Sequence, residues 1–422
     1  MYFNQKKIYR IILIVVILIK GADSAFALNL NEAVDKALET SNSIKLEKEK
    51  MNLASLGKLQ AVTLFLPQSN ITMHKFGTRS VSAPTMINTI AEDTITANIS
   101  QPLFSGLKGI SKANELMYKS QVAEHDFAEN RNNLILKITE LYLDIVKLTQ
   151  SGDLEIEAIK HYKEIIDILN RRLKIGNISF SDYVDYESKY HNLLILYNEN
   201  QAILKEKKSE IEQIIKTKIG KTTYPIIETF DMEIDEVTEL VIERNPKIQS
   251  FDKKIKVAKS NLASEYGKLL PKIDLVAEYN QQKASLYFAG GGLTTKAVYV
   301  NISIPIFQSG SEYVGIIAAH KQKNISRIEK EIAKEEAVKN VNNYYYKLKS
   351  AKENISVLKE ILTSTKRTVE IFDARFKAKD ASKIDLLLKK IEMTDLQKKI
   401  ISTKKDMLYN YYLLYASIDN IS

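Results

Sequence analysis

The chain contains no cysteine among its 422 residues. Disulfide bonds are therefore excluded, and so is a lipid-bearing cysteine at the start of an exported chain. The sequence also has no Gly-x-Ser-x-Gly and no His-Glu-x-x-His motif. Without such motifs or a free thiol, no catalytic nucleophile or metal cluster is recognisable. These absences predict a protein that is not an enzyme and that uses no cofactor.

Two weaker signals of ligand binding also fail. Gly220-Lys221-Thr222 resembles the end of a phosphate-binding loop, but Ile215 stands where such a loop needs its first glycine. The histidines do not come within metal-ligand spacing of one another, and we interpret them as solvated side chains. They are His74, His125, His161, His191 and His320.

A long apolar run is also missing. No stretch beyond residue 27 reaches the ~18 uninterrupted apolar residues of a membrane-spanning helix. The segment 1–27 is instead typical of an export signal, with basic residues at 6–10, an apolar run at 11–19 and the small-x-small cleavage site Ala25-Phe26-Ala27. That run is too short for an anchor helix, which needs about 20 residues. The mature chain is expected to be soluble after export or held by a β-barrel.

The basic excess is small and dispersed. The formal net charge of +9 falls to +6 without residues 1–27, which carry four basic residues and one acidic residue. Lysine and glutamate alternate in stretches such as 45–50, which is typical of a solvated helix face. A nucleic-acid-binding surface would gather its basic residues on one element, so we predict no nucleic-acid partner.

The two halves of the chain match each other at an offset of 203 to 204 residues. The matching pairs include Glu32 with Glu236, Leu66-Pro67 with Leu270-Pro271, Pro102 with Pro305, Tyr142 with Tyr345 and Asp182 with Asp385. A repeat of this length indicates a duplicated domain half rather than a solenoid. We therefore predict a signal peptide at 1–27, a first repeat at 28–216, a linker at 217–233 and a second repeat at 234–422.

Each repeat is predicted to contain a helix, two strands, a long helix and a shorter helix. In the first repeat these elements are 28–65, 68–76, 94–104, 105–175 and 179–216. In the second repeat they are 234–270, 271–280, 296–307, 310–377 and 382–417. The first helix is expected to start at Asn29 or Asn31 as its cap and to end before Pro67.

The long helices carry coiled-coil seams, with apolar residues at alternating spacings of three and four. The seam residues are Leu134, Ile138, Leu141, Ile145 and Leu148 in the first repeat and Val338, Val341, Tyr345 and Leu348 in the second. Ile135 and Tyr142 form a second, partly apolar edge. A helix of about 70 residues is roughly 105 Å long, which no globular core requires. Such helices, with neighbours on two sides, build sheets of helices or closed tubes.

The predicted strands alternate between apolar and polar residues. Ile95, Ala97 and Ile99 take one face, and Thr96 and Asn98 take the other. The second repeat alternates in the same way through Val298, Val300 and Ile302 against Asn301 and Ser303. A soluble sheet with one buried face would show the same alternation. In a membrane, however, four strands cannot close a barrel of about eight or more, so several chains would have to pool their strands.

A turn is expected where each strand passes into its long helix. Each turn combines proline, which interrupts a strand ladder, with an aromatic residue and glycine, which permits a sharp redirection. The turn residues are Pro102, Phe104, Gly106, Pro305, Phe307 and Gly310. Segments 78–93 and 281–295 are predicted to be loops at the far end of the strands.

These segments, in this order and present twice, resemble the TolC-like outer membrane efflux protein family. The motifs are Leu-x-x-x-Glu-Ala, which ends here at Glu32-Ala33, Leu66-Pro67, and Pro102-Leu103-Phe104-Ser105-Gly106. The resemblance covers 28–417. It implies a mainly α protein with membrane β structure, in which three chains form a twelve-stranded outer-membrane β-barrel continued by a periplasmic α-helical coiled-coil barrel. It also implies outer-membrane lipid around the barrel, a periplasmic adaptor (membrane fusion) protein and an inner-membrane transporter.

The family also has the pattern Arg-x-x-x-Gly-x-x-Ser-x-x-Asp at its periplasmic tip, which the resemblance makes an adaptor-contact surface. The first repeat keeps it through Arg172, Gly176 and Ser179. The second repeat has Arg375 and Ser382, but Lys379 stands at the glycine position. A lysine with positive φ would be strained, which questions the geometry of that tip. Phe376 and Ala381 also lack the polar groups with which some relatives hold the tip shut.

Three carboxylates, Asp182, Asp185 and Asp385, are predicted to line the periplasmic entrance. Asp182 and Asp385 each follow a serine by three residues, so the plainer interpretation is a capping-box carboxylate. Both roles are compatible, because a trimer would gather several carboxylates around a constriction that favours cations.

The predicted function is an outer-membrane exit duct for efflux or type I secretion. The alternative is a periplasmic coiled-coil adaptor without a pore, which would carry one helical hairpin rather than two. The sequence leaves the cargo, the pump and the resting state of the entrance open.

Overall fold

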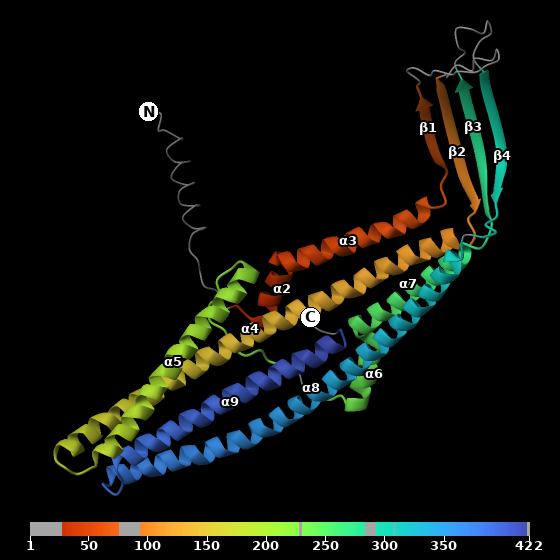
Figure 1. Cartoon of the computed structure of the whole chain (residues 1–422). Coiled ribbons are helices and arrows are strands. Elements are labelled where there is room, and N and C mark those ends of the chain that lie inside the picture. Colours follow the sequence, from red (N-terminus) through yellow and green to blue (C-terminus); the bar gives the residue numbers. More distant parts are fainter. Residues whose placement is uncertain (1–27, 76–92, 228–229, 283–292, 308, 420–422) are drawn as a thin grey trace, which may run out of the picture. The chain divides into compact units, whose positions relative to one another are not determined.

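The computed structural model describes residues 28–75, 93–227, 230–282, 293–307 and 309–419 (Figure 1). The predicted signal peptide therefore lies outside the described residues, and so does most of both predicted loops. The chain forms two compact units. Unit 1 comprises Met1–Lys45, Glu129–Asn245 and Glu336–Ser422, and unit 2 comprises Leu46–Ala128 and Pro246–Glu335. Each unit thus combines segments from both halves of the sequence.

The protein is mainly α, as predicted, with 75% of its described residues in helices. The first half contains α2 (Leu30–Thr40), α3 (Asn42–Thr63), β1 (Gln68–His74), β2 (Thr94–Phe104), α4 (Lys108–Lys174) and α5 (Phe180–Ile215). The second half contains α6 (Ile234–Arg244), α7 (Pro246–Gly267), β3 (Lys272–Gln282), β4 (Leu293–Ser303), α8 (Ser311–Lys377) and α9 (Lys383–Ser417). Among the described residues, no helix has the length and apolar character needed to cross a bilayer.

The first predicted helix of each half is in fact two helices. The first half breaks at Ser41, whose ψ of 122° is extended, and the second breaks at Asn245 with a ψ of 121°. Pro246 explains the second break, because a proline disfavours helical backbone in the residue before it. The choice between two caps is also settled. Asn29 accepts a hydrogen bond from the Glu32 N–H, and Glu32 accepts one from the Asn29 N–H, in a capping box.

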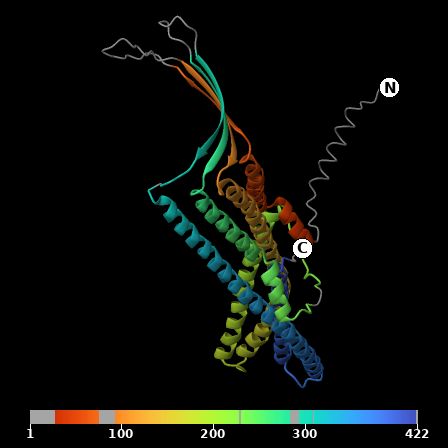
Figure 2. The ribbon, with the colours of Figure 1, turned by 90° about the vertical axis from the view of Figure 1, so that its right-hand side faces the viewer.

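The strands of unit 2 form one antiparallel sheet in the order β1-β2-β3-β4 (Figure 2). Its register places directly opposed residues on the same side. One face gathers Ile71, Met73, Ile95, Ala97, Ile99, Leu275, Ala277, Val298, Val300 and Ile302. The other gathers Asn70, Thr72, His74, Thr96, Asn98, Glu278, Asn280, Thr295 and Asn301. The predicted alternation therefore extends over all four strands, and His74 lies on the polar face as predicted. Exceptions include the polar residues Ser69, Gln101, Gln281 and Thr294 on the apolar face and the apolar residues Val276 and Ala297 on the polar face.

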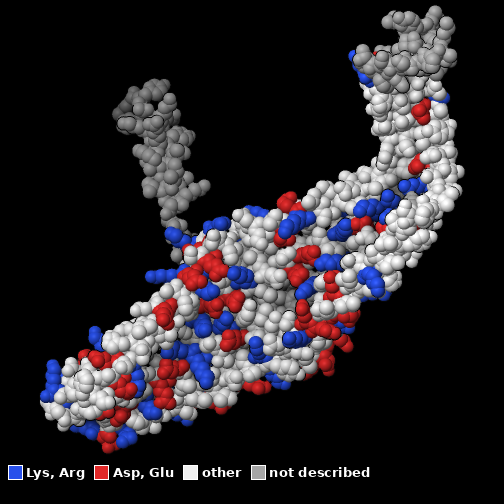
Figure 3. All heavy atoms as spheres, viewed as in Figure 1, with Lys and Arg blue, Asp and Glu red and all other residues white. Residues whose placement is uncertain are grey.

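Two details of the sheet differ from the sequence-based prediction. Pro102 does not stop the ladder, because it pairs with Asp274 and the strand continues through a register shift to Phe104. The shift accommodates a residue that lacks an N–H. Lys296 is a charged exception on the apolar face, and its Nζ lies 6.0 Å from the centre of the Tyr279 ring. The visible surface of the sheet otherwise carries few charges, whereas the helices carry interspersed basic and acidic side chains (Figure 3).

The helices of unit 2 contact one another through a close approach of their backbones and through pairs of charged side chains. A Cβ on Gly57 would lie 3.1 Å from the carbonyl oxygen of Leu116, so α3 runs close to α4. The neighbouring pair of Lys58 Nζ and Glu124 Oε1 is 2.8 Å apart. Between α7 and α8 of the same unit, Lys330 Nζ lies 2.8 Å from Asp252 Oδ1.

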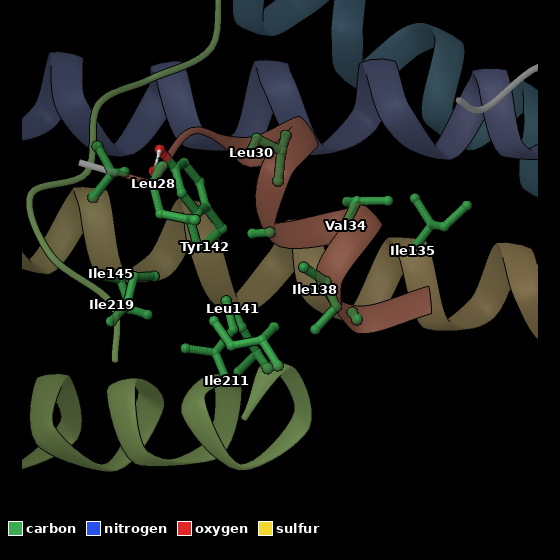
Figure 4. Close-up of a cluster of buried hydrophobic side chains, with 14 of the residues drawn as sticks. Leu28, Leu30, Val34, Ile135, Ile138, Leu141, Tyr142, Ile145, Ile211 and Ile219 are labelled. Atoms are coloured by element: carbon green, nitrogen blue, oxygen red, sulfur yellow. Dashed lines mark hydrogen bonds between the residues drawn. The ribbon is translucent and has the colours of Figure 1, made fainter. Parts of the chain in front are cut away.

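Unit 1 has its largest core where α2 and α5 pack on α4 (Figure 4). Tyr142 is buried at the centre of this core. Its hydroxyl lies 3.0 Å from the carbonyl oxygen of Leu28 and 3.1 Å from that of Thr223, and it accepts a hydrogen bond from the Thr223 N–H at 3.3 Å. This side chain therefore ties the segment before α2 and the segment after α5 to the long helix α4.

A second core of unit 1 uses the corresponding positions of the second half. Buried residues at the same offset include Ala33 and Val237, Ile138 and Val341, Ile145 and Leu348, Ile211 and Leu414, and Ile215 and Ile418. At the position of Tyr142 stands Tyr345, which packs edge-on against Phe230 with ring centres 6.3 Å apart. The two cores therefore share their buried positions and differ in how the central tyrosine is held.

Candidate functional site

The first candidate site is the turn between α4 and α5. The N–H of Gly176 donates to the carbonyl of Leu173 at 3.0 Å, and the N–H of Asn177 donates to that of Arg172 at 2.9 Å. Gly176 has a φ of 74°. This pair of hydrogen bonds around a left-handed residue is a Schellman motif, which satisfies the last carbonyls of a helix. Ile175 and Phe180 flank the turn and are 71% and 70% exposed.

The turn between α8 and α9 closes in the same way. The N–H of Lys379 donates to Phe376 at 3.0 Å, and the N–H of Asp380 donates to Arg375 at 2.8 Å. Lys379 has a φ of 60°, so the left-handed backbone that the sequence made doubtful is present. A side chain in this region costs about 1–2 kcal/mol. The lysine therefore does not alter the geometry of the tip, because the hydrogen bonds that close it come from the backbone.

Arg375 supports the second turn from within. Its Nε donates to Asp380 Oδ2 at 3.0 Å, and a terminal guanidinium nitrogen donates to the Asp380 carbonyl at 3.3 Å. The guanidinium also lies 5.6 Å from the centre of the Phe372 ring. These contacts hold the residue after Lys379 in place, which offsets part of the local strain.

The helices that follow the two turns are capped differently. Ser179 Oγ accepts from the Asp182 N–H at 3.0 Å and donates to Asp182 Oδ2 at 2.7 Å. In the second turn, Ser382 Oγ instead accepts from the Ile384 N–H at 3.2 Å. Ser179 therefore caps its helix through the Asp182 N–H, but the Asp182 carboxylate accepts from the Ser179 hydroxyl rather than from the backbone N–H of a capping box, and Asp385 takes no part in the cap bond of Ser382.

The three predicted entrance carboxylates are all exposed. Asp185 Oδ2 pairs with Lys189 Nζ at 2.7 Å, and this hydrogen bond raises the pKa of Lys189. Asp182 and Asp185 belong to α5, and Asp385 belongs to the first turn of α9. They therefore lie on two different helical hairpins of the chain.

The two tips lie in one unit and share a core. Ile165 and Leu169 of α4 pack with Ile384, Leu387 and Ile391 of α9. Lys383 forms an ion pair with Glu164 beside this core. The structure therefore brings the two helical hairpins together near their turns, which sequence separation alone does not indicate.

The strand-to-helix turns belong to unit 2 and use their glycines for different reasons. Gly106 has a φ of 62°, and a Cβ there would lie 2.6 Å from the carbonyl oxygen of Gly267. Gly310 has a φ of 77° but has open space around it. Pro305 and Phe307 follow the end of β4 at Ser303, and Phe307 is strongly exposed.

One residue was missed by the sequence analysis. Glu155 of α4 is buried in unit 1, although its side chain is a carboxylate. The seam that runs through Leu141, Ile145 and Leu148 continues with the same spacing through Gly152 to Glu155. Extending the heptad pattern by one further turn would have placed this glutamate at a buried position.

The chain resembles known outer-membrane proteins in sequence and in fold. The sequence profile described as "Outer membrane efflux protein" matches residues 237–418. The outer membrane efflux protein BepC of Brucella suis biovar 1 (strain 1330) is 18% identical over 324 residues, which cover 76% of this chain and 71% of that protein. The toxin and drug export protein A of Aggregatibacter actinomycetemcomitans is 20% identical over 399 residues, which cover 92% and 86%. The Campylobacter jejuni CmeC outer membrane channel has the same fold, with a TM-score of 0.79, 17% identity, and coverage of 93% of this chain and 86% of that one.

Proposed function

We propose that this chain belongs to the TolC-like outer membrane efflux protein family and builds an exit duct, which the profile match over residues 237–418 and the shared fold support. The protein is an outer-membrane channel for efflux or type I secretion and not an enzyme. It is located in the outer membrane, with a large helical portion in the periplasm. We propose in addition that several copies assemble one barrel and that residues 1–27 are a signal peptide. We also propose that the chain consists of two repeats and that its tip residues contact a periplasmic adaptor.

The two-faced sheet is the single observation that carries the proposed assembly. Its apolar face suits lipid, its polar face suits an aqueous lumen, and β1 and β4 are its outer strands. Open strand edges are not stable in the hydrocarbon core, because their backbone groups find no hydrogen-bond partners there. We therefore propose that β4 of one copy pairs with β1 of the next, and that three copies close a twelve-stranded barrel.

Exposed apolar side chains in each unit support contacts between copies. In unit 2 they lie on α3, as Leu53, Leu56, Leu59 and Val62, and on the first part of α8, as Ile317, Ile325, Ile328 and Ile332. In unit 1 they lie on α5, as Ile195 and Ile203, and on α8, as Val357 and Ile361. Stripes of this size on a helix favour burial against a partner. Neighbouring copies in a helical tube would cover them.

The two helical tips are the proposed contacts for a periplasmic adaptor, which would couple the duct to an inner-membrane transporter. Their Schellman turns present exposed apolar residues at Ile175 and Phe180, beside the polar residues Arg172 and Ser179. The second tip presents Arg375, Lys379 and Ser382 on the same backbone geometry. The proposed entrance carboxylates follow each turn, where three copies would bring them around the periplasmic opening.

The alternative of an adaptor without a pore has no support among the relatives, which are outer-membrane efflux proteins. The name of the Aggregatibacter relative joins toxin export with drug export. We propose that this duct likewise exports toxins or drugs, and that the inner-membrane transporter rather than the duct selects them.

The assembly is tested on the protein extracted from the outer membrane in detergent. Native mass spectrometry should give a trimer, and circular dichroism should show a helical content well above the ~35% of ordinary domains. A cysteine pair placed across β1 and β4 should crosslink only between copies. A monomer released by osmotic shock, with no crosslinked trimer, would overturn the proposal.

A further inference from the structure

Glu155 of α4 is a buried carboxylate in the helical part of unit 1. Only 2% of the surface of this residue is exposed. Oε1 accepts a hydrogen bond from Asn200 Nδ2 of α5 at 2.8 Å. Oε2 is also buried, and within the described residues it has no hydrogen-bond partner. A buried oxygen without a partner is costly, and the cost rises when the group is ionised.

The fold does not require a carboxylate at this position. At the corresponding position of the second half stands Leu358, which is also buried on its long helix α8. An apolar side chain therefore fills this seam position in one hairpin, whereas the other keeps a titratable group there. Replacing a buried ionic group by an apolar one is often neutral or stabilising, so stability alone does not account for Glu155.

The charges around Glu155 do not compensate its burial. Burial raises the pKa of Glu155, and the Asn200 hydrogen bond and the positive charge of Lys398 only partly oppose it. Lys398 belongs to α9 and is itself paired with Asp395, with Nζ 2.9 Å from Oδ1. From α5 the contact is the neutral amide of Asn200. The carboxyl is therefore more easily protonated in the packed hairpin than an exposed carboxyl is.

We propose that Glu155 is a proton-sensitive lock on the α4–α5 hairpin, which packs tightly when the carboxyl is protonated and loosens when it ionises. The sign follows from linkage: the packed state binds the proton more strongly than the loosened state does. The stabilising effect is complete below the ordinary pKa of a carboxyl and is lost as the pH rises through the raised pKa of Glu155. The periplasmic setting of this lock rests on the proposed function, but the lock itself does not.

A second titratable group on α4 acts in the opposite direction. Burial lowers the pKa of His161, which also faces Glu157 and Glu164 of its own helix and Lys390 of α9. Its Nε2 lies 3.6 Å from Glu157 Oε1. Because the neutral imidazole is favoured in the packed state, His161 would loosen the hairpin as the pH falls. The two groups can therefore be distinguished by the direction of the pH response.

The test is hydrogen–deuterium exchange of the detergent-solubilised protein from about pH 4 to pH 8, corrected for the intrinsic exchange rate. Peptides of α5 around Asn200 should lose protection as the pH rises. The loss should be up to about tenfold for each unit by which the pKa of Glu155 exceeds its ordinary value. Glu155→Gln, which keeps the shape of the side chain, should remove this dependence, and Glu155→Leu should remove it as well.

Two further variants complete the test. Asp153→Asn changes an exposed carboxylate two residues away and should leave the profile as it is in the unmodified protein. Leu358→Glu should transfer the dependence to the α8–α9 hairpin. If the pH profile survives in Glu155→Gln, or disappears in Asp153→Asn, the lock is overturned. Failure of the protein to form trimers would instead contradict the proposed function, because the exchange readout reports on a hairpin within one chain.

Discussion

The first and second halves of the chain build the same elements, yet they differ at several corresponding places. Tyr142 holds two backbone segments by hydrogen bonds, whereas Tyr345 packs against an aromatic ring. Gly176 closes the first tip, and Lys379 closes the second with the same backbone bonds. Glu155 occupies a seam position that Leu358 fills in the other half.

This comparison separates what the architecture requires from what it only tolerates. Buried aliphatic positions recur in both halves because the helices must bury one face in each. Backbone hydrogen bonds recur at the tips because any helix end needs partners for its last carbonyls. At the tips the side chain is free to differ between the halves, because backbone hydrogen bonds already supply the geometry.

The largest expected effect tests whether the two halves share one lipid boundary. Lysine at Ile99 in β2 or at Val300 in β4 should each block insertion, because a cation at the bilayer midplane costs about 2–4 kcal/mol. Lysine at Thr96 or Asn301, on the polar face, should be tolerated. The measurement is the amount of heat-stable trimer in the outer membrane. Equal loss from both faces would show that the sheet does not separate lipid from water.

The next effect sharpens the contrast between the two central tyrosines. Tyr142→Phe removes a hydroxyl that bonds Leu28 and Thr223, and it should lower the free energy of unfolding by about 1–3 kcal/mol. Tyr345→Phe should change it much less, since its ring packing is retained. Denaturant melts of the purified variants provide the comparison. If both variants lost the same stability, the hydrogen-bonded clasp would not distinguish the halves.

A smaller effect concerns the two tips. Gly176→Ala should destabilise the first hairpin by about 1 kcal/mol, because its φ of 74° is unfavourable for a side chain. Lys379→Gly should relieve the corresponding strain, although the greater freedom of glycine in the unfolded chain offsets part of the gain. Thermal unfolding of both variants gives the sign. A loss of stability in Lys379→Gly would show that the lysine side chain stabilises its turn.

The most specific test separates the capping role from the entrance role. Ser179→Ala should cost about 0.5–2 kcal/mol through loss of a cap. Asp385→Ala should leave the helix cap and its contribution to stability unchanged, because Ser382 Oγ accepts from the Ile384 N–H instead. In planar bilayers, alanine at Asp182, Asp185 and Asp385 should weaken cation preference and block by divalent cations, with the trimer intact. Unchanged selectivity together with lower stability would leave Asp182 with a capping role alone.

The sequence by itself determined the elements that repeat locally regular patterns. The period of two in the strands predicted the polar and apolar faces, and the register bears this out for all four strands. The three-four spacing predicted the long helices to within a few residues of α4 and α8. Local chemistry instead questioned the geometry at Lys379, because the aligned position in the first half is a glycine, yet the backbone there is left-handed as it is at Gly176.

Only the tertiary structure decided which of these elements pack together and how their caps are used. Each compact unit draws on both halves of the chain, and the tips share a core between α4 and α9. Ser179 and Ser382 have equivalent sequence contexts but bond different N–H groups. The burial of Glu155 also depends on which segments pack against α4. Periodicity predicts which face of a helix is covered. The segments that cover this face are distant in the sequence, and their packing determines which side chains are buried, which hydrogen bonds they form and how their pKa values shift.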